Sequence, residues 1–287
     1  MDILVLGASG LAGSAILRVL QAEGHTVSGT CRAVPDPTLL RFDSEQPQAI
    51  VPLLERVRPD VVVSCLRGEF TCQLELHRLL ADFLHRHHKR LLYLSTANVF
   101  DGDLSRPHYE GDPPRSDSTY GQFKIACETL LRARLGDDLV ILRPPEIWGT
   151  DCPRLRALIT KLRASSPVVT YENLSVNYAV DTQIAQWAAF ILEHDLRGIF
   201  HVGTRDLSDY TLFLERLAEE LNLPRPHFDI ELNDIPQYQA VLPGRQEIPA
   251  RLQITVDDVL HRLANAPTLS FSVKTEPAAI RWVSVRQ

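Results

Sequence analysis

The chain has 287 residues, of which 45% are hydrophobic and 23% charged, and its formal net charge is -6 at pH 7. These values are ordinary for a globular protein with one large domain or two modest ones. The negative charge offers no basic field to nucleic acid or to an anionic membrane, and no run approaches the roughly 20 apolar residues of a membrane-spanning helix.

The cysteines indicate reduced thiols and therefore a cytoplasmic setting. They are odd in number and scattered without a C-x-x-C pair, which argues against a disulfide framework or a zinc site; they are Cys31, Cys65, Cys72, Cys127 and Cys152. Asp2 stands where a signal peptide would carry basic residues. The histidine-rich stretch 85–89 falls at a predicted helix end, where cations are favoured by the helix dipole, so we predict no metal site.

The first half of the chain alternates between short β-rich runs and helical stretches. Strands are predicted at 3–6, 26–30, 61–65, 90–95 and 139–143, and helices at 11–22, 47–57, 72–87 and 120–135. Nearly continuous Val, Ile and Leu is typical of parallel strands buried on both faces. Alternation at this spacing predicts right-handed βαβ units, and hence an α/β fold with a doubly wound Rossmann sheet.

After Gly149 the alternation becomes irregular. Stretches 168–170 and 198–202 are predicted to return to the sheet, with a helix entered at Asp181 between them. Helices at 209–221 and 255–263 enclose a proline-rich connection over 224–253. We therefore predict a Rossmann domain over 1–150, with returning segments at about 168–203. A smaller α+β substrate lobe is predicted mainly from 151–167 and 204–287.

Three glycines follow the first predicted strand at intervals of three. Gly7 permits a sharp turn, Gly10 allows close approach of a pyrophosphate, and Gly13 lets the following helix lie against the strand. The helix N-terminus would supply N–H donors to the phosphates. The loop, with Ser9 and Leu11, therefore predicts a dinucleotide site, although its spacing differs from the usual G-x-G-x-x-G.

The end of the second predicted strand favours NADP(H) over NAD. An acidic side chain there would bind the adenosine ribose hydroxyls, but the sequence reads Ser28-Gly29-Thr30-Cys31-Arg32. A carboxylate repels a 2′-phosphate, whereas a guanidinium can clamp it. We therefore assign Arg32 to the cofactor site.

Two stretches carry the predicted chemistry. Tyr120 and Lys124 are four residues apart and so project from one face of a helix. A neighbouring ammonium group, together with an oxidised nicotinamide ring, is expected to lower the pKa of the tyrosine. Thr96, after the fourth predicted strand, offers a hydroxyl to a substrate carbonyl. Three groups are thus predicted to converge on one ketone.

These motifs resemble those of the extended short-chain dehydrogenases/reductases. LSTANVFDG at 94–102 is similar to the STDYVFDG stretch of dTDP-4-dehydrorhamnose reductases, as are ILRPPEIWG at 141–149 and the region 199–221. The resemblance implies reduction of a 4-keto-6-deoxy nucleotide sugar by Thr96, Tyr120 and Lys124, with Lys124 also holding the nicotinamide ribose. By similarity, Asp43 would contact adenine and Cys65 would face the cofactor.

The substrate side departs from that family. Asn98 and Ala97 replace a tyrosine and an aspartate, and SCLRGEF at 64–70 lacks the usual N-A-A. Asn98 is kept as a substrate-side residue, and Arg143 and Arg245 as diphosphate clamps. A homodimer is left open. Two alternatives remain: an epimerase or dehydratase that recycles NAD, and a non-catalytic NADP-binding regulatory subunit.

Overall fold

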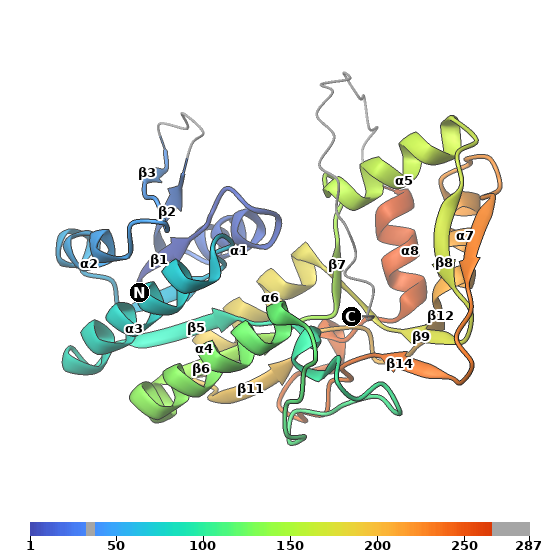
Figure 1. The fold of residues 1–287 in the computed structure, drawn as a ribbon. Coiled ribbons are helices and arrows are strands. Elements are labelled where there is room, and N and C mark those ends of the chain that lie inside the picture. The colour runs from blue at the N-terminus through green and yellow to red at the C-terminus, as the bar shows by residue number, and fades with distance from the viewer. Residues whose placement is uncertain (33–37, 266–287) are drawn as a thin grey trace.

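The structure, a computed structural model, describes residues 1–32 and 38–265. Its main sheet has seven strands in the order β11-β6-β5-β4-β1-β2-β3, each paired in parallel with its neighbours (Figure 1). The strands are β1 (Asp2–Leu6), β2 (Thr26–Cys31), β3 (Leu40–Arg41), β4 (Val61–Ser64), β5 (Arg90–Leu94), β6 (Leu139–Arg143) and β11 (Gly198–His201). The predicted α/β fold class is confirmed.

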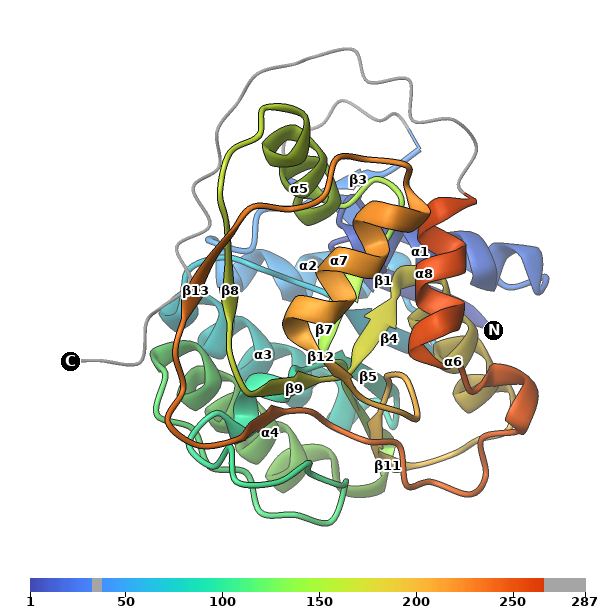
Figure 2. The same cartoon turned by 90° about the vertical axis from the view of Figure 1, so that its right-hand side faces the viewer.

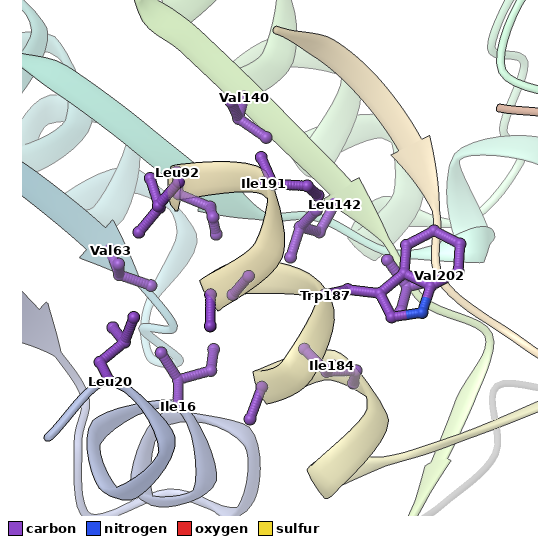
Figure 3. Packing of buried hydrophobic residues seen from close by; sticks show 14 of the residues in the cluster. Ile16, Leu20, Val63, Leu92, Val140, Leu142, Ile184, Trp187, Ile191 and Val202 are labelled. Carbon is purple, nitrogen blue, oxygen red and sulfur yellow. The ribbon is translucent and has the colours of Figure 1, made fainter. Parts of the chain in front are cut away.

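Helices cover both faces of this sheet. They are α1 (Leu11–Ala22), η1 (Pro47–Ala49), α2 (Ile50–Val57), α3 (Phe70–Arg86), η2 (Ala97–Phe100), α4 (Thr119–Leu135), η3 (Gly136–Asp138) and α6 (Asp181–Glu193). Successive strand residues point to opposite faces. Val5 and Val63 therefore pack with α1 and α6, whereas Leu4 and Val62 pack with α2, α3 and α4. Figure 3 shows the first of these cores, with Ile16 and Trp187 facing the strands.

A second region follows β6. It comprises β7 (Glu146–Trp148), α5 (Pro153–Arg163), β8 (Val168–Tyr171), β9 (Leu174–Val176), β10 (Tyr178–Val180), β12 (Ser208–Asp209), α7 (Tyr210–Glu220), β13 (Phe228–Glu231), β14 (Gln237–Gln239), η4 (Ala250–Leu252) and α8 (Val256–Ala264). Helices α5, α7 and α8 share a separate core around Trp148 and Phe213. Residues 266–287, the end of the predicted substrate lobe, lie outside the described residues.

One predicted strand joins a different sheet. Residues 198–201 return to the main sheet beside β6, as expected. Residues 168–171 do form a strand, but β8 pairs with β13 instead of the main sheet, and Figure 2 shows the two strands side by side. The prediction was wrong on this point because β-rich composition indicates a strand and does not specify its partner. No helix in the described part of the chain is long and apolar enough to cross a bilayer.

Candidate active site

Three neighbouring strands bring the candidate residues to one edge of the sheet. The glycine loop follows β1, residues 65–69 follow β4, and Thr96 follows β5, and these strands are adjacent in the order β5-β4-β1. In a parallel sheet the carboxyl ends of the strands lie at the same edge, where α/β proteins bind ligands. The loops from these three strands therefore meet.

The glycine loop has the geometry of a phosphate cradle. Gly7 has φ +80°, and a Cβ on it would lie 3.0 Å from the carbonyl oxygen of Cys65. A Cβ on Gly13 would lie 2.3 Å from the carbonyl oxygen of Gly7. Gly10 is the N-cap of α1 and provides no side-chain cap, so the first-turn N–H groups of the helix remain available to an anion. The loop therefore fits a dinucleotide pyrophosphate. Ser9 is exposed and Leu11 is half-buried at this turn.

At the far side of β2, Arg32 lies beside two carboxylates. Its guanidinium contacts both oxygens of Glu45 at 2.7 and 2.8 Å and an oxygen of Asp43 at 3.3 Å. These carboxylates raise the pKa of Arg32, with the Glu45 hydrogen bond as the largest cause. An open cavity of about 620 Å³ adjoins them, and its lining also includes Arg41 and Arg56. Sequence reasoning missed both of these arginines.

Thr96, Tyr120 and Lys124, called the triad below, lie together, as predicted from the spacing of Tyr120 and Lys124 and the place of Thr96 after a strand. The Thr96 hydroxyl donates to Asn98 Oδ1 at 3.0 Å and accepts from the Asn98 N–H at 3.2 Å. The Tyr120 phenol lies near enough to this hydroxyl for Thr96 to lower the pKa of the phenol. Lys124 Nζ donates to the carbonyl of Leu94 at 3.0 Å and lies 6.0 Å from the centre of the Tyr120 ring. Asn98 is thus part of the same cluster.

The start of α4 is fixed by a carboxylate that the sequence did not single out. Asp101 accepts hydrogen bonds from the hydroxyls of Ser116 and Ser118 and from the backbone N–H of Asp117. Ser118 is the N-cap of α4, and its hydroxyl accepts from the N–H of Gly121. Because Tyr120 lies in that first turn, Asp101 sets where the phenol points.

The pKa of Tyr120 differs from the expectation. Its pKa is raised above 10, with burial as the largest cause, while Arg67 and the Thr96 hydrogen bond lower it. The residue as a whole is 37% exposed, but the pKa responds to the surroundings of the hydroxyl. Burial also lowers the pKa of Lys124 to about 8. In the protein without cofactor, the net shift of the Tyr120 pKa is therefore upward, because desolvation exceeds the lowering by Arg67 and Thr96.

Arg67 is a site residue that sequence reasoning missed. It is exposed in the loop after β4 and makes no hydrogen bond or ion pair with any described residue. Its charge lowers the pKa of both Tyr120 and Lys124. Phe70, at the end of the same loop, lies 6.1 Å from the Tyr120 ring and 4.6 Å from that of Phe123. The departure of SCLRGEF from the family pattern was the available signal.

Cys65 directly follows β4 and lies near both the glycine turn and Lys124. Its carbonyl is 3.0 Å from the position of a Gly7 Cβ. Burial raises the pKa of its thiol to about 12, although the nearby Lys124 lowers it. The Cys65 thiol is therefore protonated and uncharged at neutral pH, and it lines the site without acting as a nucleophile.

Two predicted substrate residues are corrected. Arg143 is fully buried, and its Nε and Nη2 contact Glu128 at 3.0 and 2.6 Å, so it cannot reach a substrate diphosphate. Arg245 donates to the carbonyls of Arg197 and Ile199 at the amino end of β11, and pairs with Glu247 at 2.7 Å. That end of the strand is opposite the triad. An isolated arginine in a sequence does not reveal such intramolecular partners.

Among residues 1–32 and 38–265, no group of three or more His, Cys, Asp or Glu side chains is arranged to hold a metal ion.

Comparison with known proteins identifies one matching family. The NAD dependent epimerase/dehydratase family matches residues 3–194. The dTDP-4-keto-6-deoxy-D-glucose reductase of Streptomyces niveus is 29% identical over 213 residues, 69% of this chain and 71% of that protein. The "Probable low-salt glycan biosynthesis reductase Agl14" of Haloferax volcanii is 25% identical and covers 76% and 80%. Methionine adenosyltransferase 2 subunit beta of Danio rerio is 24% identical and covers 78% and 75%.

Solved structures share the fold at lower identity. A dTDP-4-dehydrorhamnose reductase from Yersinia enterocolitica has a TM-score of 0.77 and 16% identity, covering 91% of this chain and 99% of its own. A second such reductase, from Bacillus anthracis in complex with NADP, has a TM-score of 0.77 at 17% identity, covering 91% and 96%. The dTDP-glucose 4,6-dehydratase of B. anthracis, in complex with NAD, also reaches 0.77 at 13% identity, covering 92% and 95%.

Proposed function

The chain belongs to the NAD dependent epimerase/dehydratase family of extended short-chain dehydrogenases/reductases, and we propose that it is an NADPH-dependent reductase of a nucleotide-linked 4-keto-6-deoxysugar. The observation that carries the proposal is the meeting of Thr96, Tyr120 and Lys124 beside the glycine loop. A relative named as a reductase of such a sugar, at 29% identity, supports the substrate class.

In this proposal the main sheet and its helices hold the cofactor. The pyrophosphate would lie against the turn of Gly7, Gly10 and Gly13, and Lys124 would hold the nicotinamide ribose. The bound cofactor supplies a hydride to the carbonyl carbon. The region from β7 onward, apart from α6 and β11, forms the substrate lobe in this proposal.

The residues of the chain donate the proton and orient the substrate carbonyl. Burial raises the pKa of Tyr120, so its hydroxyl keeps a proton at neutral pH and can give it to the carbonyl oxygen as the alkoxide develops. The Thr96 hydroxyl, now donating to Asn98 Oδ1, would turn to the same oxygen. Charged Lys124, anchored on the Leu94 carbonyl, favours the phenolate that remains.

The choice of NADPH rests on three arginines, which lie after β2, at the end of β3 and in the last turn of α2. Arg32, Arg41 and Arg56 line one open cavity, and guanidinium groups bind phosphate well. The guanidinium of Arg32 already forms ion pairs with Asp43 and Glu45. A 2′-phosphate that binds Arg32 must therefore displace at least Glu45. We therefore expect Glu45 to weaken NADPH binding and Arg32 to strengthen it.

Thermal shift with NADPH and with NADH tests this choice, because a ligand of the native state raises the melting temperature. NADPH should stabilise the protein more than NADH. Arg32→Ala should abolish the difference, and Glu45→Ala should enlarge it. Arg225→Ala, which removes an exposed arginine paired with Glu215 elsewhere, is the matched control. Stronger stabilisation by NADH, unchanged in Arg32→Ala, would contradict the NADPH assignment.

Two rival functions lead to different observations. A cofactor-recycling epimerase or dehydratase would convert its substrate without net oxidation of NADPH. The relative named as a subunit of methionine adenosyltransferase, which matches 78% of this chain, favours the second rival, a non-catalytic subunit. Such a subunit would bind NADP(H), turn over no keto-sugar nucleotide and co-purify with a partner enzyme.

A further inference from the structure

Behind the triad lies a buried polar cluster of Ser95, Glu128 and Arg143. The Ser95 hydroxyl donates to Glu128 Oε1 at 2.5 Å. Arg143 Nε donates to the same oxygen at 3.0 Å, and Nη2 donates to Oε2 at 2.6 Å. Arg143 is 0% exposed and Glu128 2%. Ser95 directly follows β5, Glu128 lies in the middle of α4, and Arg143 is the last residue of β6.

Stability is a poor explanation for this cluster. Removing two charges from water costs several kcal/mol per ion, and apolar replacement of a buried pair is often neutral or stabilising. Arg143 Nη1 has no hydrogen-bond partner among the described residues, which adds to the cost. Its guanidinium lies 5.1 Å from the ring centre of Phe100 in η2. Because burial of this cluster is costly while its hydrogen bonds are short and well directed, we look for its role in holding neighbouring residues in place.

The cluster is directly connected to the triad. Ser95 precedes Thr96, and the backbone on both sides is tied to β6 and its extension, since Ser95 N donates to Leu142 O at 2.7 Å and Ala97 N to Pro144 O at 2.8 Å. Glu128 is one helical turn beyond Lys124 and two beyond Tyr120. Ser95 thus links the strand that carries Thr96 to the helix that carries Tyr120.

We propose that Ser95, Glu128 and Arg143 are positioning residues that hold the Thr96 hydroxyl against the Tyr120 phenol. Glu128, clamped by Arg143, fixes Ser95, and the adjacent Thr96 can then reach the phenol on the neighbouring helix. The consequence for turnover rests on the proposed reductase function. The positioning itself does not depend on it and can be measured without substrate.

The direct test is the titration of the phenol at position 120. A 3-fluorotyrosine at position 120, followed by ¹⁹F NMR, reports the pKa of this phenol in the whole protein. The titratable and charged groups around the phenol are Arg67 from the loop after β4, Tyr93 from β5, and Lys124 and Cys127 from α4. The nearby Thr96 hydroxyl lowers this pKa, because it can turn from Asn98 to donate to the phenolate. Ser95→Ala should therefore raise the pKa of the phenol by about half a unit to one unit.

A double-substitution cycle decides whether Ser95 acts through Thr96. In a Thr96→Val background, Ser95→Ala should produce no further shift. No shift in the natural background, or an equal shift in both, would overturn the proposal. Thr170→Val, which removes a buried hydroxyl contact with Thr211, is the matched control and should leave the titration unchanged.

An apolar replacement of the ion pair provides a second arm. Glu128→Met combined with Arg143→Met removes both charges together and should fold. We expect kcat with dTDP-4-keto-6-deoxy-D-glucose to fall at least tenfold while the KM for NADPH is unchanged. Natural kcat in a folded double variant would overturn the proposal. If the natural protein shows no turnover, the reductase function fails, and the ¹⁹F cycle still decides the positioning role.

Discussion

At the scale of single residues, the site combines a protonated phenol with a lysine that is charged at pH 7 and loses its charge at mildly alkaline pH. Burial raises the pKa of Tyr120 and lowers that of Lys124 to about 8. Both shifts follow from removing charged forms from water. Tyr120 therefore keeps its proton for a carbonyl oxygen at neutral pH, whereas Lys124 loses its charge at mildly alkaline pH.

This difference predicts an alkaline limit to reduction. kcat/KM should be constant near pH 7 and fall as pH rises through about 8, because Lys124 loses its proton there. A pH–rate profile of the natural protein and of Lys124→Arg tests this. Arginine stays protonated throughout, so the variant, although slower, should lack the decline near pH 8. A decline retained in Lys124→Arg would assign it to another group.

Arg67 should set the position of the same limit. Its charge lowers the pKa of Lys124 and of Tyr120, so Arg67→Ala should move the decline to higher pH. Arg67→Lys keeps the charge and should leave the profile close to that of the natural protein. Identical profiles for Arg67→Ala and the natural protein would mean that solvent screens this cation from the site.

At the scale of elements, the separation of α4 from η2 depends on one glycine. A Cβ on Gly121 would lie 2.2 Å from the carbonyl oxygen of Asn98 and 2.1 Å from Ser116 Oγ. Gly121→Ala must therefore push the helix carrying Tyr120 away from the segment carrying Thr96. We expect a loss of about 1–3 kcal/mol in the free energy of unfolding and a larger relative loss in kcat than in NADPH affinity.

The matched control is Gly111→Ala in the loop before α4. A Cβ on Gly111 would meet no atom of residues 1–32 or 38–265 within 4 Å, so this variant should match the natural protein in urea unfolding and in turnover. Natural stability and kcat in Gly121→Ala would show that α4 can shift without consequence for the triad.

The sequence predicted the elements that carry strong periodicity. Helix 11–22 and strand 139–143 have the bounds expected from their patterns. Helix α5 went unrecognised because its polar face and its Pro153 start obscure the pattern, and the partner of β8 lies about 60 residues farther along the chain. Local patterns contain no information on such distant pairing.

The same distinction holds within the site. The four-residue spacing of Tyr120 and Lys124 is local, and the sequence predicted their common face. Burial depends on the whole fold, so the raised pKa of Tyr120 and the pairing of Arg143 with Glu128 were not predictable. Arg32 was recognised at the end of β2, but its contact with Glu45 was not.

At the scale of the whole molecule, two buried neutral histidines predict sensitivity to mild acid. Burial lowers the pKa of His77 to about 4 and that of His201 to about 3. The unfolded chain takes up these protons below about pH 6.5. Because the unfolded state then binds more protons, the free energy of unfolding should fall as pH drops from 7 to 5, by about 2 kcal/mol for each histidine.

Urea unfolding at pH 7, 6 and 5 checks this expectation. His77→Gln should have a shallower pH dependence than the natural protein, by about 2 kcal/mol over that range. A control histidine is His85, an exposed residue in the last turn of α3, and His85→Gln should leave the slope unchanged. Equal slopes for His77→Gln and the natural protein would show that His77 is not kept neutral by the fold.

The most direct test of the central claim is NADPH oxidation in the presence of dTDP-4-keto-6-deoxy-D-glucose by the natural protein and by Tyr120→Phe. We expect substrate-dependent oxidation that slows by about 10²–10⁴-fold in Tyr120→Phe, with NADPH binding retained. Tyr109→Phe, at a tyrosine that is 48% exposed, should remain fully active. Turnover at the natural rate in Tyr120→Phe, or no oxidation by a natural protein that binds NADPH, would contradict the account.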